Sequence, residues 1–235
     1  MTSSFCVTTS FCVTIVRKRF RTVVYILLGA LAALALVLLG AYQALVAVPG
    51  EYRVVVEADP QIQREASDEL LQQAAALASD LRQQRDWEAW FTESQINGWL
   101  AVDLMENHPG TLPNGVSDPR VAIRGKTVSI YCRTQRGGTD TVLTLVVEPY
   151  LDEPNVLGLR FHRARVGLLP LPLGNIVEQV SKAARDLELK LAWRQTDGDP
   201  VALVTIPEML DDGKSLRIEH LELRDGEFYV AGSSD

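Results

Sequence analysis

Apolar residues form one unbroken run near the start of the chain. Between Thr22 and Val48 there is no charged residue, and Leu, Ala and Val dominate the composition. At about 1.5 Å per helical residue the run reaches about 40 Å, which exceeds the hydrocarbon thickness of a bilayer. The pattern therefore predicts a transmembrane helix over residues 22–48.

The charges that flank this run predict its orientation. Four basic residues precede it and acidic residues follow it: Arg17, Lys18, Arg19 and Arg21 before, and Glu51, Glu57 and Asp59 after. By the positive-inside rule the chain crosses a cytoplasmic (inner) membrane once, with residues 1–21 as a cytoplasmic tail and the remainder extracytoplasmic. The alternative is a cleaved signal peptide. A retained anchor is favoured because an ordinary signal core has about 7–15 apolar residues and no well-placed cleavage site ends one here.

Residues 49–87 are predicted to form an extended segment over Tyr52–Val56 and then a long helix, which acts as a stalk or as part of the following domain. Asp59 and Pro60 supply a helix cap and a first-turn proline. One apolar stripe runs along the helix at helical spacing: Ile62, Ala66, Leu70, Ala74, Leu77 and Leu81. This stripe predicts an amphipathic helix.

A second, shorter helix is predicted to begin after Phe91. Thr92 and Gln95 have the spacing of a capping box, in which each residue bonds the backbone of the other. One face then carries Ile96, Trp99, Leu100 and Leu104, and the helix ends before the loop that starts at Asn107.

From Val121 the apolar period changes from 3.6 to 2, which predicts strands. Turns near Gly125, Gly137 and Pro154 separate four strands of an antiparallel meander, the third over Thr141–Val147 and the fourth over Val156–Leu169. In the fourth strand the apolar phase slips, so a bulge at His162-Arg163 is needed to keep both apolar sets on one face.

A third helix is predicted over Leu173–Leu191. Its stripe of Val177, Val180, Ala184 and Leu187 is expected to pack on the meander against Leu145 and Phe161. A strand over Val201–Ile206, a helical turn over Pro207–Asp212 and a terminal hairpin over 216–230 follow. Residues 88–235 are thus predicted to form an α+β extracytoplasmic domain, with an antiparallel sheet packed on amphipathic helices.

The charge balance argues against nucleic-acid binding. The chain has a net charge of −7, and all four basic residues of the first fifty precede the acids, which leaves a net −11 after residue 50. Phosphate backbones require positive charge, so a nucleic acid is not an expected partner.

No pattern in the sequence predicts catalysis, a cofactor or a metal site. The three histidines, His108, His162 and His220, lack metal-ligand spacing, and no phosphate loop or nucleophile motif is present. A hydrolase is the least favoured function, because no nucleophile and base are recognisable together.

Two stretches resemble a known family. They are Phe91-Thr92-Glu93-Ser94-Gln95-Ile96-Asn97-Gly98-Trp99-Leu100 and Val166-Gly167-Leu168-Leu169-Pro170-Leu171-Pro172. With the N-terminal anchor they resemble the YpmS-like membrane-anchored envelope proteins and, more distantly, the tubular lipid-binding (TULIP) and AsmA-like domains. The resemblance spans residues 88–232 in order of elements. It implies a curved antiparallel sheet wrapped around a helix, with an apolar groove for acyl chains and no catalytic residues.

The residues independently indicate an apolar site. The strand Thr141–Val147 is apolar on both faces, so a helix, a partner protein or a lipid must cover the second face. The predicted groove comprises Trp99, Leu100, Leu145, Phe161 and Val180, with Trp99 and Leu100 at its mouth. Three arginines of one strand, Arg160, Arg163 and Arg165, are the predicted contact for an anionic headgroup. Their alternative role is an ordinary solvated face.

The favoured function is therefore a membrane-anchored extracytoplasmic module that binds a lipid or another apolar molecule of the cell envelope. The alternative is a structural or assembly protein of the envelope. It would bind another protein through its sheet face or long helix, without a ligand.

Overall fold

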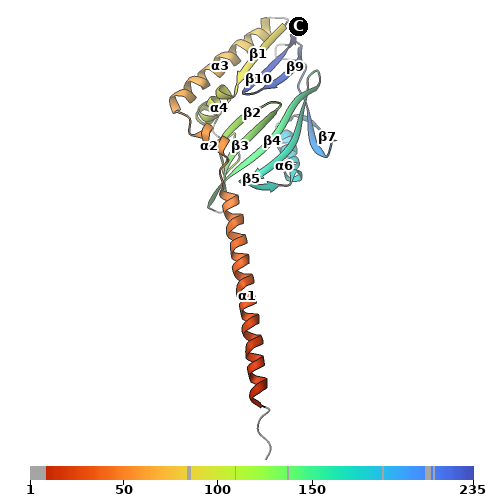
Figure 1. The fold of residues 1–235 in the computed structure, drawn as a ribbon. Coiled ribbons are helices and arrows are strands. Elements are labelled where there is room, and N and C mark those ends of the chain that lie inside the picture. Colours follow the sequence, from red (N-terminus) through yellow and green to blue (C-terminus); the bar gives the residue numbers. More distant parts are fainter. Residues whose placement is uncertain are drawn as a thin grey trace, which may run out of the picture. The chain divides into compact units, whose positions relative to one another are not determined.

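The computed structural model describes residues 9–83, 86–108, 110–136, 138–186, 188–209, 213 and 215–235, and their side chains from residue 28 onward except that of residue 136. The chain divides into two compact units, Met1–Ala44 and Leu45–Asp235. Nearly all of one long helix belongs to the first unit, and every described strand belongs to the second (Figure 1).

The long helix, α1 (Thr9–Val46), contains the apolar run. Its leucines between Leu28 and Leu39 are exposed on all sides, with Leu31 64% exposed and Leu36 69% exposed. A helix that is apolar all round and not covered by protein requires an apolar surrounding. Among the described residues α1 is the one helix long and apolar enough to cross a membrane, so the predicted apolar helix is confirmed.

The described residues of the second unit form two antiparallel sheets and five helices. Its strands are β1 (Asp86–Thr92), β2 (Val116–Arg124), β3 (Thr127–Arg136), β4 (Thr139–Glu153), β5 (Val156–Val166), β6 (Leu169–Leu171), β7 (Lys190–Thr196), β8 (Asp199–Thr205), β9 (Leu216–Arg224) and β10 (Glu227–Ser234). Its helices are α2 (Gly50–Val56), α3 (Pro60–Gln83), α4 (Glu93–Ala101), α5 (Asp103–Asn107) and α6 (Leu173–Asp186). A small sheet has the order β1-β10-β9, and a large sheet has the order β2-β3-β4-β5-β8-β7, with β6 beside β5. The α+β class and the four-stranded meander are confirmed.

The predicted bulge in β5 is present. Val146 pairs with Arg163 and Val147 pairs with Phe161, so His162 is the extra residue. As a result Phe161 and Ala164 both face the core, where they are 3% and 2% exposed. The bulge thus allows the apolar residues before and after it to face the same core.

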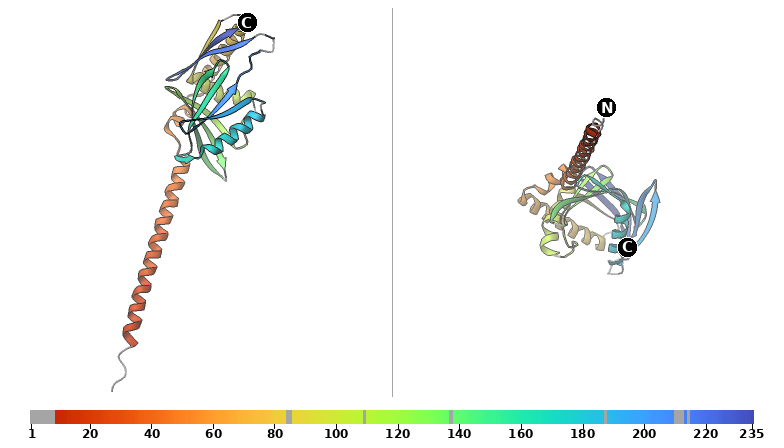
Figure 2. Two further views of the ribbon diagram at one scale, coloured as in Figure 1. Left: turned by 90° about the vertical axis from the view of Figure 1, so that its right-hand side faces the viewer. Right: turned by 90° about the horizontal axis from the view of Figure 1, so that it is seen from below.

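The helix α6 packs on the large sheet, as predicted (Figure 2). Ile176 of α6 joins a buried cluster with Val147, Phe161, Ala164 and Ala202. Against this cluster pack Leu145, Leu159, Leu171, Leu173, Val180, Leu191 and Trp193. The helix contributes Ile176 to this cluster in place of the expected Val177, and the predicted contact of Leu187 lies outside the described residues.

The predicted end of this helix at Leu191 is wrong. The helix ends at Asp186, and Glu188 adopts a left-handed φ of 55°, which allows the Leu189 N–H to donate to the Ala184 carbonyl at 2.8 Å. Residues 190–196 then form β7, which alternates Leu191 and Trp193 toward the core. Leu191 fits both a helical and a strand pattern, and cross-strand pairing with β8 decides between them.

The predicted extended segment over Tyr52–Val56 is also wrong, because these residues form α2. Tyr52 is 1% exposed, and its hydroxyl donates to the Asp118 carbonyl at 3.0 Å. Its ring lies 5.7 Å from that of Tyr131, in a second buried cluster with Ala122 and Val142. Burial of this ring on the sheet outweighs the strand preference of the three valines. Thus α2 covers part of the second face of β4.

Three smaller differences complete the comparison. Residues 86–92 form the unpredicted strand β1, which pairs with β10. The predicted second helix is divided into α4 and α5 at Val102. Residues 207–209 contain no helix, and residues 210–212 of the predicted helical turn lie outside the described part of the chain. The long helix is confirmed as α3, although Ile62 of its predicted stripe is 57% exposed.

Side chains of α4 complete the edge of the large sheet. The amide of Asn97 both accepts from the Val121 N–H and donates to the Val121 carbonyl, each at 2.8 Å. Glu93 accepts from the Ile123 N–H at 2.7 Å. The predicted capping box of Thr92 and Gln95 is present at the start of this helix. The helix therefore protects the open edge of β2, which would otherwise expose unpaired backbone groups.

Candidate functional site

The candidate site is a cavity of about 290 Å³ on the face of the large sheet opposite α6. Leu145 and Ala164 face α6, and strand alternation turns their neighbours to the other face. The lining residues are Pro49, Gly50, Glu51, Ser129, Tyr131, Thr144, Val146, Arg163, Arg165, Gly167 and Leu168. We refer to this feature as the arginine cavity.

Strand register arranges the floor of the arginine cavity in two cross-strand rows. One row is Ser129, Val146 and Arg163, and the other is Tyr131, Thr144 and Arg165, each from β3, β4 and β5 in turn. The start of α2 and the turn after β5 supply the walls. Residues far apart in sequence are therefore brought together by the pairing of three strands.

Two guanidinium groups distinguish this cavity. The side chain of Arg163 is exposed and that of Arg165 is half-buried, and neither guanidinium makes a hydrogen bond or an ion pair with another described residue. The bulge at His162 sets both side chains on the cavity face while Phe161 and Ala164 stay in the core. The site thus offers two positive groups that no described residue neutralises.

Polar groups on the floor and wall add hydrogen-bonding capacity. The Tyr131 hydroxyl donates to Glu51 Oε2 at 2.7 Å. Burial, and then this hydrogen bond, raise the pKa of Tyr131 to about 12, so Tyr131 is a neutral donor at physiological pH. The Thr144 hydroxyl is buried and has no hydrogen-bond partner among the described residues. A buried hydroxyl without a hydrogen bond lowers the stability of the folded state. A ligand that reaches the floor of the cavity is a candidate hydrogen-bond partner for it.

Arg160, the third predicted anion contact, is engaged elsewhere. Its guanidinium lies 2.9 Å from Asp199 and 3.3 Å from Asp197. His162 bridges Asp199 and Glu148 at 2.9 Å each. Desolvation raises the pKa of Asp199, but hydrogen bonds from Arg160 and His162 outweigh it and hold this pKa below its usual value. The structure therefore separates Arg160 from Arg163 and Arg165.

The five residues of the predicted apolar groove lie in two places. Leu145, Phe161 and Val180 belong to the core beneath α6, where the rings of Phe161 and Trp193 are 5.8 Å apart. Trp99 and Leu100 lie on α4, which packs against α3, β1 and β2. The structure thus does not bring the two groups together.

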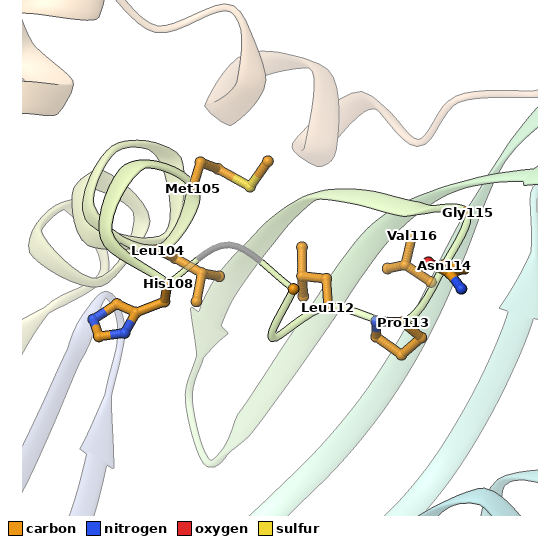
Figure 3. A pocket seen from close by; sticks show the side chains of 9 residues that line it. Leu104, Met105, His108, Leu112, Pro113, Asn114, Gly115 and Val116 are labelled. Atoms are coloured by element: carbon orange, nitrogen blue, oxygen red, sulfur yellow. The ribbon is translucent and has the colours of Figure 1, made fainter.

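A second cavity, of about 280 Å³, is lined by residues of α5 and the loop that follows it (Figure 3). The ring of His108, one of these residues, lies 5.9 Å from that of Trp99. Leu104 and Met105 of α5 face Leu112, Pro113 and Val116 of the following loop and strand. His108 lines it as well and lies 3.3 Å from Asp103. No lysine or arginine is among the described residues that line the second cavity. No group of three or more potential metal ligands occurs in the described part of the chain.

No family model, curated protein or solved structure matches this chain. The structure nevertheless gives roles to the two stretches that carried the resemblance. In the first stretch Thr92 and Gln95 form the capping box of α4. Glu93 and Asn97 of the same stretch form hydrogen bonds with the backbone of β2. In the second stretch Gly167, with a φ of 58°, turns the chain beside the arginine cavity and donates to the Val142 carbonyl at 2.8 Å.

Sequence analysis did not identify Glu51, Tyr131 or Thr144 as site residues. A signal for Thr144 exists, since it is the polar position between Val142 and Val146 on one face of a strand that is otherwise apolar. Its row with Tyr131 and Arg165 depends on the register of three strands, which no local pattern contains. Glu51 joins the site only because residues 50–56 fold as a helix.

Proposed function

We propose that this protein is a membrane-anchored module that binds the phosphate group of a membrane lipid in the arginine cavity. The observation that supports this most strongly is the pair of unpartnered guanidinium groups on the floor of the cavity, in a part of the chain whose net charge is −11. Arginine is the side chain best suited to phosphate, because its planar fork donates two hydrogen bonds to one group.

Chain connectivity supports a lipid over a soluble phosphate. The cavity wall begins at Pro49, three residues after α1 ends at Val46. Three residues span at most about 11 Å, so an α1 that crosses a bilayer keeps this wall close to the membrane surface. Exposed apolar side chains accompany it: Val48 is 42% exposed and Leu168, on the cavity rim, is 58% exposed. Apolar rim residues suit the boundary between headgroups and acyl chains.

We propose that the arginine cavity lies on the extracytoplasmic side of the membrane. Basic residues before α1 favour a cytoplasmic N-terminus, so the cavity would serve the extracytoplasmic leaflet of the envelope. The lipid headgroup enters the cavity while its acyl chains remain in the bilayer. The proposal therefore requires no apolar tunnel through the core that Leu145, Phe161 and Val180 help to form.

Native mass spectrometry of the full chain, released from a non-ionic detergent, tests this proposal with phosphatidylglycerol as the probe. We expect discrete adducts of one lipid per chain. The double variant Arg163→Glu, Arg165→Glu should weaken them at least tenfold, because each lost charge-assisted bond contributes about 1.5–3 kcal/mol.

A matched control is Lys182→Glu, Lys190→Glu, which makes the same change of charge at two exposed positions, on α6 and β7. It should bind phosphatidylglycerol as the wild type does. Equal binding by the arginine variant, or the absence of adducts in the wild type, would refute the proposal. A lipid-free chain that forms a stable oligomer would favour the assembly function instead.

A further inference from the structure

The arginine cavity carries an acidic group as well as two basic ones, and this bears on which lipid it accepts. Glu51 lines the cavity, and its carboxylate is held by the Tyr131 hydroxyl at 2.7 Å, with Arg124 at 4.0 Å. It forms no ion pair with Arg163 or Arg165 among the described residues. The positive and negative groups of the cavity are therefore held apart and do not neutralise each other.

Strand spacing gives the scale of this separation. Tyr131, which holds Glu51, lies on β3, and Arg165 lies on β5 in the same cross-strand row. Two strand spacings place their backbones about 10 Å apart. Thr144 lies between them, with its hydroxyl unbonded. The long arginine side chains reach into the space between the two strands. A small headgroup spans the remaining distance between the guanidinium groups and the Glu51 carboxylate.

We infer that the cavity is selective for a phosphodiester headgroup that also carries a primary ammonium, with its phosphate on Arg163 and Arg165 and its ammonium on Glu51. This inference rests on the proposed function. A simple anion in the cavity meets the Glu51 carboxylate, and like charges in one site repel. A headgroup that brings its own ammonium removes this repulsion and gains a charge-assisted hydrogen bond.

The carboxylate has the free capacity that this arrangement needs. A carboxylate offers about four acceptor sites, and the Tyr131 hydroxyl uses one of them. The Glu51 side chain is 54% exposed, so an incoming ammonium reaches it without displacing a protein group. A quaternary ammonium has no N–H to donate, which predicts discrimination against choline.

A competition experiment on the full chain tests the selectivity. Phosphatidylethanolamine, phosphatidylglycerol and phosphatidylcholine are supplied in equal amounts in a non-ionic detergent, and their adducts are compared by native mass spectrometry. We expect the ethanolamine lipid to exceed each of the others by roughly threefold to fivefold, the range for a half-exposed charge pair.

Two variants separate this inference from the proposed function. Glu51→Gln keeps an acceptor for Tyr131 and should abolish the ethanolamine preference while the phosphatidylglycerol adduct remains. Glu57→Gln, at the other end of α2 and outside the cavity, is the control and should keep the preference. If the three lipids bind equally, or Glu51→Gln leaves the preference unchanged, the ammonium site is refuted while arginine-dependent binding still stands. If Arg163→Glu, Arg165→Glu also leaves binding unchanged, both proposals fail.

Discussion

Gly98 of α4 lies close against α3, and its replacement gives a sharp test of the fold. A Cβ added at Gly98 would lie 2.6 Å from the Gln63 carbonyl oxygen, 2.7 Å from the Ser67 nitrogen and 2.9 Å from Ala66 Cβ. Two of these three atoms are backbone, so they cannot rotate away as a flexible side chain would. Gly98→Ala therefore forces the two helices apart.

The change in the free energy of unfolding of Gly98→Ala follows from two opposing effects. Overpacking a tight contact typically costs about 1–3 kcal/mol, and contacts this short with backbone favour the upper end. Alanine in a helix interior recovers about 1 kcal/mol relative to glycine. We expect a net loss of about 2 kcal/mol in the free energy of unfolding, which lowers the melting temperature by about 4–8 °C for a unit of this size.

The assay is thermal and urea unfolding of the full chain, followed by near-ultraviolet circular dichroism. Gly174→Ala is the matched control, because Gly174 also lies in a helix, α6, and an added Cβ there meets nothing within 4 Å. The control should unfold at the same temperature as the wild type or slightly higher. A Gly98→Ala variant as stable as this control would refute the close packing of α3 and α4.

Three further predictions concern the edge, the core and the pH response of the domain. Asn97→Ala leaves the backbone of Val121 without its two side-chain bonds and should cost about 2 kcal/mol in urea unfolding. Asn97→Asp keeps the acceptor but turns a buried carboxylate oxygen toward the Val121 carbonyl, and it should cost at least as much. Phe161→Ala removes a ring that is 3% exposed and should cost about 3–5 kcal/mol; a loss under about 1 kcal/mol would contradict its place in the core. The pKa of Tyr131 is raised in the folded state to about 12, so its contribution to stability is fully present below pH 10 and is lost as the pH rises toward 12. Tyr131→Phe should make the free energy of unfolding fall less steeply over that interval, and an unchanged slope would argue against the raised pKa, which burial and then the bond to Glu51 produce.

Local patterns predicted the features of this fold that depend on neighbouring residues. The phase slip between Phe161 and Ala164 located the bulge of β5, since both side chains must reach one core. The spacing of Thr92 and Gln95 likewise predicted the start of α4, because a capping box involves only residues three apart.

Features that depend on distant partners could not be predicted in this way. Nothing near Tyr52 indicates a helix; its burial against Tyr131, far along the chain, decides the conformation of α2. The same limit applies to the site. Arg163 and Arg165 were identified from one strand, but the cavity around them requires the register of β3, β4 and β5 and the position of Glu51.

The most direct test of the proposed function is to map where a lipid headgroup lies on the full chain in a bilayer. The chain is reconstituted with a phospholipid that carries a photoreactive diazirine on its headgroup, and the cross-linked peptides are identified by mass spectrometry. We expect labels on residues 49–51 and 163–168, in the walls and floor of the arginine cavity, and their loss in the Arg163→Glu, Arg165→Glu variant. Labelling confined to α1, or to the second cavity around Leu112, with no label at residues 163–168, would contradict the account.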